Sequence, residues 1–296
     1  MASFTAVDLS RLPAPDLIEA LDFETIFSEA LSQFRRLMPK FSALAESDPV
    51  FMILQLFAAR ELLLRQRAND KAQQTMLAFA TGTNLDHLGA LFGVARLELD
   101  PGQPDTGTAP TYESDVDFRR RIQLAPEGFS VAGPEGAYIY HALSAAADVM
   151  DASATSPAPG QVLVTVQSRT GTGKAPQELL DKVAAVLTDA DVRPLTDEVT
   201  VQSAQIVNYA IRGSVYTYAG PDSSVVMREA LRSLQAYLAE AHRIGHDVPE
   251  SAIKAKLFVE GVQRVELIWP AIDVKVSRTQ AAYCKSIEIV HGGIDE

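Results

Sequence analysis

The chain has 296 residues, 47% of them hydrophobic, with a mean hydropathy of +0.03, which predicts two or three compact units rather than a disordered chain. It carries 26 basic and 38 acidic residues, a net charge of −12. Nucleic acid and anionic membranes bind clustered positive charge, so neither is expected as a direct partner. The single cysteine, Cys284, excludes disulfide frameworks and multi-cysteine metal sites and is typical of a cytoplasmic protein.

The N-terminal sequence does not predict secretion or membrane insertion. Residues 1–16 lack a basic stretch followed by an apolar one, so no secretory signal is expected. The most apolar run, residues 50–57, is interrupted by Gln55 and is far shorter than the roughly 20 residues that cross a bilayer. We therefore expect a soluble protein.

The first predicted helix covers residues 12–37 and is ended by Pro39. Its charges up to Phe34 are all acidic. Such a face is typical of a solvated helix, and it is also typical of an interaction helix that meets a basic partner. The acidic residues are Asp16, Glu19, Asp22, Glu24 and Glu29.

A second, longer helix is predicted after Asp48, a suitable N-cap, with Pro49 in the first helical position. No glycine or proline follows before Gly82, which predicts about 33 residues and a length of about 50 Å. A helix of this length favours a bundle or a reach beyond its own domain. Its basic residues predict either solvated or intrachain-paired charges or a docking stripe, and they are Arg60, Arg65, Arg67 and Lys71.

The middle of the chain is predicted as short helices separated by loops. A helix over residues 84–92 is followed by residues 100–111, whose prolines and glycines predict a linker or exposed loop and the first domain boundary. Helices over residues 112–124 and 137–147 come next. The first of these contains three consecutive basic residues, Arg119, Arg120 and Arg121.

From residue 161 the hydrophobic period changes to that of strands. The expected order is strand, helix, strand over residues 161–205, then strand, helix, helix, strand over residues 206–277. The fold class is therefore α+β and multidomain, with an N-terminal helical bundle segment followed by two small sheet-plus-helix modules. The predicted divisions are residues 1–99, 100–160, 161–205, 206–277 and a C-terminal tail at 278–296.

Three sequence patterns have the residue types or spacing of a chemical site. The loop 168–174 resembles a phosphate-binding loop, but Ser168 stands where its first glycine belongs and Ala175 where its hydroxyl belongs, so a tight turn is favoured. His242 and His246 have a metal-like spacing interrupted by Gly245, and the proximity of Cys284 to His291 in sequence decides little. No catalytic, cofactor or metal residue is predicted, although a nucleotide- or metal-dependent hydrolase using one of the first two patterns remains the alternative.

Several segments resemble the baseplate J-like family, the wedge proteins of contractile phage tails, R-type tailocins and related injection systems. The resemblance implies a structural protein without a catalysed reaction and without a cofactor. The segments that carry it are residues 59–70, 79–94, 118–138, 157–160, 192–197 and 292–296.

The resemblance also implies an assembly. Two copies of the chain and one related second wedge protein would form a heterotrimer, and their N-terminal helices would form a bundle. The wedges would join in a ring around the central hub, and this ring would carry the sheath-initiator protein. The particle would assemble in the bacterial cytoplasm, and the ring would transmit the trigger for sheath contraction.

The charges add a hypothesis about which surfaces meet. The six arginines named above, on two separate helices, are hypothesised to contact acidic helices such as residues 16–29 of another chain. Residues before 161 hold 12 basic and 21 acidic residues, net −9. Because like charges repel, the nearly neutral remainder is predicted to join copies of this chain, and the acidic half a different partner.

Overall fold

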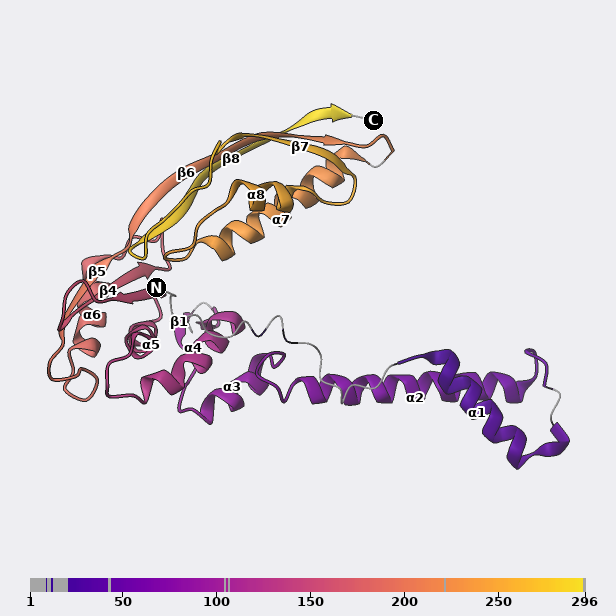
Figure 1. The fold of residues 1–296 in the computed structure, drawn as a ribbon. Helices are drawn as coiled ribbons and strands as arrows, with labels where there is room; N and C mark the ends of the chain where they lie inside the picture. Colours follow the sequence, from indigo (N-terminus) through magenta and orange to yellow (C-terminus); the bar gives the residue numbers. More distant parts are fainter. Residues whose placement is uncertain are drawn as a thin grey trace. The chain divides into compact units, whose positions relative to one another are not determined.

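A computed structural model describes residues 9, 12, 21–41, 44–103, 105, 107–220 and 222–294 (Figure 1). These residues form two compact units: an N-terminal unit between residues 9 and 95 plus residues 115–119, and a C-terminal unit of residues 96–114 and 120–294. In chain order the helices and strands are α1 (Phe23–Leu37), η2 (Pro39–Phe41), α2 (Pro49–Gln73), α3 (Gly82–Ala90), β1 (Glu98–Asp100), β2 (Thr111–Tyr112), α4 (Asp115–Gly128), α5 (Glu135–Ala145), β3 (Val149–Thr155), β4 (Gln161–Ser168), α6 (Gln177–Leu187), β5 (Glu198–Ser203), β6 (Gln205–Thr217), α7 (Ser223–Ala241), α8 (Glu250–Leu257), β7 (Val262–Trp269) and β8 (Gln280–Ile294).

The first helix begins later than the sequence predicts. Residues 21 and 22 are not helical, and most of residues 12–20 lie outside the described part of the chain. Asp22 is the N-cap, because its carboxylate accepts hydrogen bonds from the backbone N–H groups of Glu24 and Thr25 at 3.3 and 3.1 Å. The helix packs on α2, where the ring of Phe27 meets the ring of Phe51 edge-on.

The predicted length of α2 is wrong. The helix starts at Pro49 as expected, but it ends at Gln73 after 25 residues, about 37 Å. The turns that follow are held from elsewhere: Arg119 donates to the carbonyl oxygens of Leu77 and Ala80 at 2.7 and 2.6 Å. Gly82, with φ of +53°, begins α3 instead of ending α2.

Strands β1 and β2 pair as a short antiparallel hairpin, and the described residues between them, within the predicted linker or exposed loop at 100–111, lie at its tip. The tip is closed by a bridge between Gln103 and Thr108, and Gly102 is required there because a Cβ atom would lie 2.4 Å from the carbonyl oxygen of Thr108. Since Thr111 and Tyr112 pair as a strand, the next helix begins at Asp115 and not at residue 112 as predicted.

The first module, residues 135–203, contains a three-stranded sheet of order β3-β4-β5. Strands β4 and β5 are parallel and are joined by α6, which confirms the predicted strand–helix–strand order. Strand β3, antiparallel to β4, is missing from the prediction. The core is formed by Val164 and Val166 of β4 packed with Leu179 and Val183 of α6.

The second module, residues 205–294, has its own sheet of order β7-β6-β8, with α7 and α8 along one face (Figure 1). Its separate core includes Ile211 and Val215 of β6 and Leu234 of α7. Within the predicted C-terminal tail at 278–296, residues 280–294 form β8, which pairs with β6 in parallel.

The predicted fold class is confirmed: a helical segment is followed by two sheet-plus-helix modules. The five-part domain division of the sequence stays a prediction. Among the described residues, no helix combines the length and the apolar character needed to cross a membrane.

Candidate protein interface

Helix α2 exposes a stripe of large apolar side chains along one face. Their exposed fractions lie between 54% and 64%, and their spacing of three and four residues places them on the same side of the helix. The interface residues predicted from the sequence are all charged and do not include this stripe, although its spacing is visible in the sequence. The stripe residues are Met52, Ile53, Leu56, Phe57, Leu63 and Leu64.

A shallow apolar groove of about 260 Å³ continues the stripe toward α1. Phe34 and Leu37 of α1 line one side, and Ile53 and Phe57 of α2 line the other. Leu37 is largely exposed. Within the part of the chain that the structure describes, the pair α1–α2 therefore buries only part of its apolar surface, a pattern typical of a protein contact.

The three predicted arginines of α2 lie on two faces. Arg60 and Arg67 are exposed and, being seven residues apart and in step with Ile53, Leu56 and Leu63, lie within the stripe. Arg65 lies further around the helix, where its Nη2 is 2.6 Å from the carboxylate of Glu61 one turn earlier. A partner helix bound on the stripe would therefore contact Arg60 and Arg67 rather than Arg65.

The arginine run 119–121 points in three directions, because successive helical residues are rotated by about 100°. Arg119 holds the turns after α2, as described above. Arg120 forms an ion pair with the buried carboxylate of Asp151 at 2.7 Å. Arg121 is buried against Glu113. All three guanidinium groups thus have partners inside this chain, and their contact with another chain stays a prediction.

The ion pair of Arg121 and Glu113 is the most deeply buried in the described chain, with 6% and 2% of the side chains exposed. Arg121 Nε and Nη2 donate to the two carboxylate oxygens at 3.1 and 2.5 Å, and its Nη1 donates to Ser144 at 3.2 Å. Glu113 also accepts from the N–H of Leu97 at 2.9 Å. This network fixes the start of the C-terminal unit to α4 and α5.

The acidic residues predicted for the interface are only partly placed. Asp16 and Glu19 lie outside the described residues. Asp22 caps α1, and the hydrogen bond from the Thr25 side chain, followed by that from its backbone, lowers the pKa of the Asp22 carboxyl. Glu24 is exposed in the first turn of the helix.

The loop 168–174 makes the tight turn that the sequence favours. Gly171 and Gly173 have φ values of +65° and +95°, and the N–H of Ser168 donates to the carbonyl oxygen of Gly173 at 2.9 Å. A Cβ atom at Gly173 would lie 2.9 Å from Nε2 of His242 and 3.0 Å from Nε2 of Gln167. The inner side of the loop is therefore packed against side chains and does not form an open cradle.

His242 and His246 do not share a helical face. Helix α7 ends at Ala241, and His242 is its C-cap, with Nδ1 2.7 Å from the carbonyl oxygen of Ala282. His246 lies in the loop beyond. Within the described ranges, no three side chains of the metal-binding types gather around a common point.

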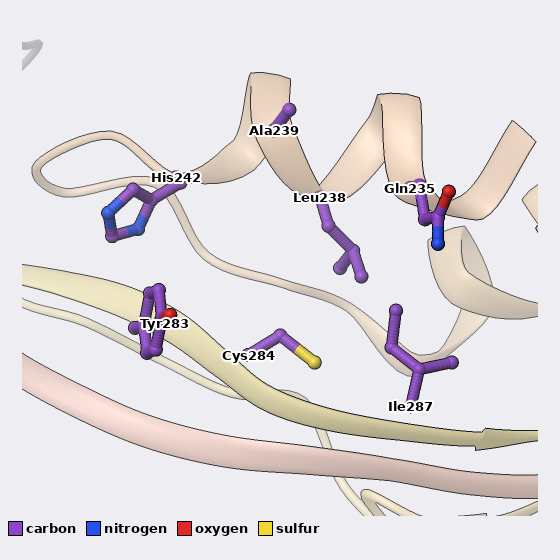
Figure 2. Close-up of a pocket in the computed structure, with 7 residues that line it drawn as sticks. All are labelled: Gln235, Leu238, Ala239, His242, Tyr283, Cys284 and Ile287. Atoms are coloured by element: carbon purple, nitrogen blue, oxygen red, sulfur yellow. The ribbon is translucent and has the colours of Figure 1, made fainter. Parts of the chain in front are cut away.

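Cys284 faces a small cavity of about 240 Å³ between α7 and β8, shown in Figure 2. Leu238 and Ile287 lie beside it, and the ring of Tyr283 meets His242 edge-on with centroids 5.4 Å apart. Burial raises the pKa of the Cys284 thiol, which disfavours a nucleophilic thiolate. His291 is seven residues further along the strand, about 23 Å away, and bonds to Thr217 at 3.1 Å.

Comparison with known proteins gives matches to two family models, one relative and one solved structure. A family model of the Baseplate J-like N-terminal domain matches residues 46–103, and one of the Baseplate J-like central domain matches residues 130–203. Baseplate protein J of Escherichia phage P2 is 46% identical over 299 residues, which cover 98% of this chain and 99% of that protein. A chain in the cryo-electron microscopy structure of the anti-feeding prophage (AFP) baseplate, 6-fold symmetrised, is 15% identical with a TM-score of 0.41, over 60% of this chain and 43% of that chain.

Proposed function

Because this chain belongs to the baseplate J-like family, we propose that it is a structural wedge subunit of the baseplate of a contractile phage tail or related particle. In this role it assembles in the bacterial cytoplasm with a second copy of itself and a related second wedge protein. The wedges join in a ring around the central hub, bind the sheath-initiator protein and transmit the trigger for contraction. The identity with a phage baseplate protein over nearly the whole chain supports this assignment.

The apolar stripe of α2 is the observation that carries the proposal. Six large apolar side chains are more than half exposed on a helix of 25 residues. Complete burial of a fully exposed side chain of this kind contributes about 1.5–3 kcal/mol, and each of these six has roughly half of its surface left to bury, so a helix of another chain on this stripe would be held firmly. We assign the stripe and the adjoining groove to the helical bundle that joins the wedge proteins.

Arg60 and Arg67 give the bundle its charge preference. Both lie within the apolar stripe, so the helix that covers it needs carboxylates opposite them. An acidic segment such as residues 16–29 of another copy, or an acidic helix in the second wedge protein, meets this need. The nearly neutral second half of the chain is assigned to contacts between copies in the ring.

The test is co-purification of the full chain with the second wedge protein after co-expression. Leu56→Glu and Leu63→Glu on the stripe are expected to abolish the complex while the circular dichroism melting curve of the isolated chain is unchanged. Leu195→Glu is the matched control, because Leu195 is 98% exposed on a loop of the C-terminal unit. Stripe variants that co-purify as well as this control would refute the assignment.

The predicted role of the α2 arginines in the interface is tested by charge-reversal variants in the same co-purification experiment. Arg60→Glu with Arg67→Glu is expected to weaken the complex more strongly at low salt than at high salt, because exposed charges are screened by ions. Arg65→Glu, beside the stripe, tests whether Arg65 belongs to the same contact. Equal retention of the complex for the double variant and the unmodified chain would remove the arginines from the interface.

A further inference from the structure

The two modules of the C-terminal unit are joined by a single residue. Strand β5 ends at Ser203 and β6 begins at Gln205, so Ala204 alone connects them, and it is buried. The N–H of Ala204 donates to the carbonyl oxygen of Val166 in the first module at 2.8 Å, while that of Gln205 donates to Thr279 in the second at 3.0 Å. The covalent connection is therefore too short to let the modules separate. A single point of attachment would still permit one module to rotate relative to the other.

A second attachment lies at the start of β3, the edge strand of the first sheet. Arg243, in the loop after α7, donates through Nη1 to the carbonyl oxygen of Met150 at 2.6 Å. The next residue, Ile244, donates its backbone N–H to the carboxylate of Asp151 at 2.9 Å. Two consecutive residues of the second module thus hold two consecutive residues of the first.

A third attachment lies at the other end of β3. Ser153 donates its hydroxyl to the carbonyl oxygen of Arg278 at 2.5 Å, and Arg278 donates back to the carbonyl oxygen of Ala154 at 3.1 Å. The guanidinium of Arg278 also forms an ion pair with Glu135 in α5. The outer edge of β3, which would otherwise offer unpaired groups to another chain, is thus contacted by the second module near both of its ends.

Asp151 is the centre of this junction. Its side chain is 4% exposed, and its two oxygens accept from three groups: the guanidinium of Arg120 in α4 at 2.7 Å, the N–H of Ile244 at 2.9 Å and its own neighbour Ala152 at 2.9 Å. A buried carboxylate requires such partners, because an uncompensated charge is strongly disfavoured away from water. One side chain therefore links α4, β3 and the loop between α7 and α8.

We propose that the two modules are one rigid arm, latched at β3 by Asp151, Arg243 and Arg278, and that Asp151 is the residue on which the latch depends. Three attachments that do not lie on one line remove the freedom to rotate about Ala204. The arm then moves as a single body, which, on the proposed function, lets a displacement at one module reach the neighbour bound to the other.

The test measures the distance between the modules in the full chain by electron paramagnetic resonance. With Cys284→Ser as background, spin labels are attached at Ala185→Cys on α6 and Ala236→Cys on α7, both exposed positions. A single narrow distance distribution is expected. A broad distribution in this unaltered junction would overturn the proposal.

Removing the latch is expected to broaden that distribution. Asp151→Ala is the principal variant. Arg243→Ala with Arg278→Ala removes the guanidinium contacts of both attachments and leaves the buried carboxylate and the two backbone hydrogen bonds in place, so a second measurement exists even if the first variant does not fold. Arg212→Ala breaks an exposed pair with Glu288 outside the junction and is the control, which should keep the narrow peak. A narrow peak in the double variant would overturn the part assigned to Arg243 and Arg278, and one in folded Asp151→Ala would overturn the dependence of the latch on Asp151.

Discussion

Replacing Arg121 with alanine is the sharpest test of the packing between α4 and the start of the C-terminal unit. The change removes the guanidinium donors to both carboxylate oxygens of Glu113, whose side chain is only 2% exposed. The hydrogen bond from the N–H of Leu97, at 2.9 Å, stays in place. Breaking a buried pair in this way costs about 3–5 kcal/mol, because one charge stays buried without its partner. Against a typical stability of about 5–15 kcal/mol, the loss is large.

The measurement is urea unfolding of the full chain followed by far-ultraviolet circular dichroism. Arg232→Ala is the matched control, because its pair with Glu229, at 2.8 Å, is exposed at 78% and 49% of the side chains, where solvent screening leaves little net stabilisation. The combined change Glu113→Gln with Arg121→Met should recover much of the loss, since no charge remains buried. Equal midpoints for Arg121→Ala and the control would refute the reasoning.

Further measurements test other parts of the fold. Burial lowers the pKa of His141 below its usual 6.5, so the unfolded chain binds the proton first and the free energy of unfolding should decrease as the pH falls below 6.5 in a series of urea titrations; a rise would contradict this. The raised pKa of Cys284 predicts slower alkylation by iodoacetamide at pH 8 in the native protein than in urea, and equal rates would contradict it. At positive φ, Gly173→Ala should cost about 1–3 kcal/mol and more than Gly171→Ala, because only the former meets other atoms, among them Nε2 of His242; similar melting temperatures would contradict that packing.

Local signals in the sequence predict much of this fold. Pro49 marks the start of α2, and the spacing of Leu179, Val183 and Leu187 identifies the buried face of α6. Alternation of valines predicts β4, whose Val164 and Val166 are fully buried. In each case the information lies within a dozen residues, because helix caps and hydrophobic periods are local properties.

The missed features depend on residues that are distant in the chain. Strand β3 has the sequence Val-Met-Asp-Ala-Ser-Ala-Thr, whose small and acidic residues have low strand propensity, and it is held by β4 and by the second module. Strand β8 contains Gly292 and Gly293, typical of a tail, and pairs with β6, which starts 75 residues earlier. The end of α2 depends on Arg119, 42 residues beyond Leu77.

The arginine run illustrates the same limit for the candidate site. Three adjacent positive charges suggest one basic surface, but the helix directs Arg119, Arg120 and Arg121 to different internal partners. The apolar stripe of α2, by contrast, can be found from spacing alone. Whether another part of the same chain covers the stripe cannot be predicted from spacing, because it depends on the tertiary fold.

The one-residue connection at Ala204 has a consequence for how the family can vary in length. In a strand, successive side chains point to opposite faces, so one inserted residue between β5 and β6 would turn the second module over relative to the first. The hairpin tip around residue 105 carries no such constraint. Related chains are therefore expected to gain and lose residues at that tip, while the segment from β5 into β6 keeps its length.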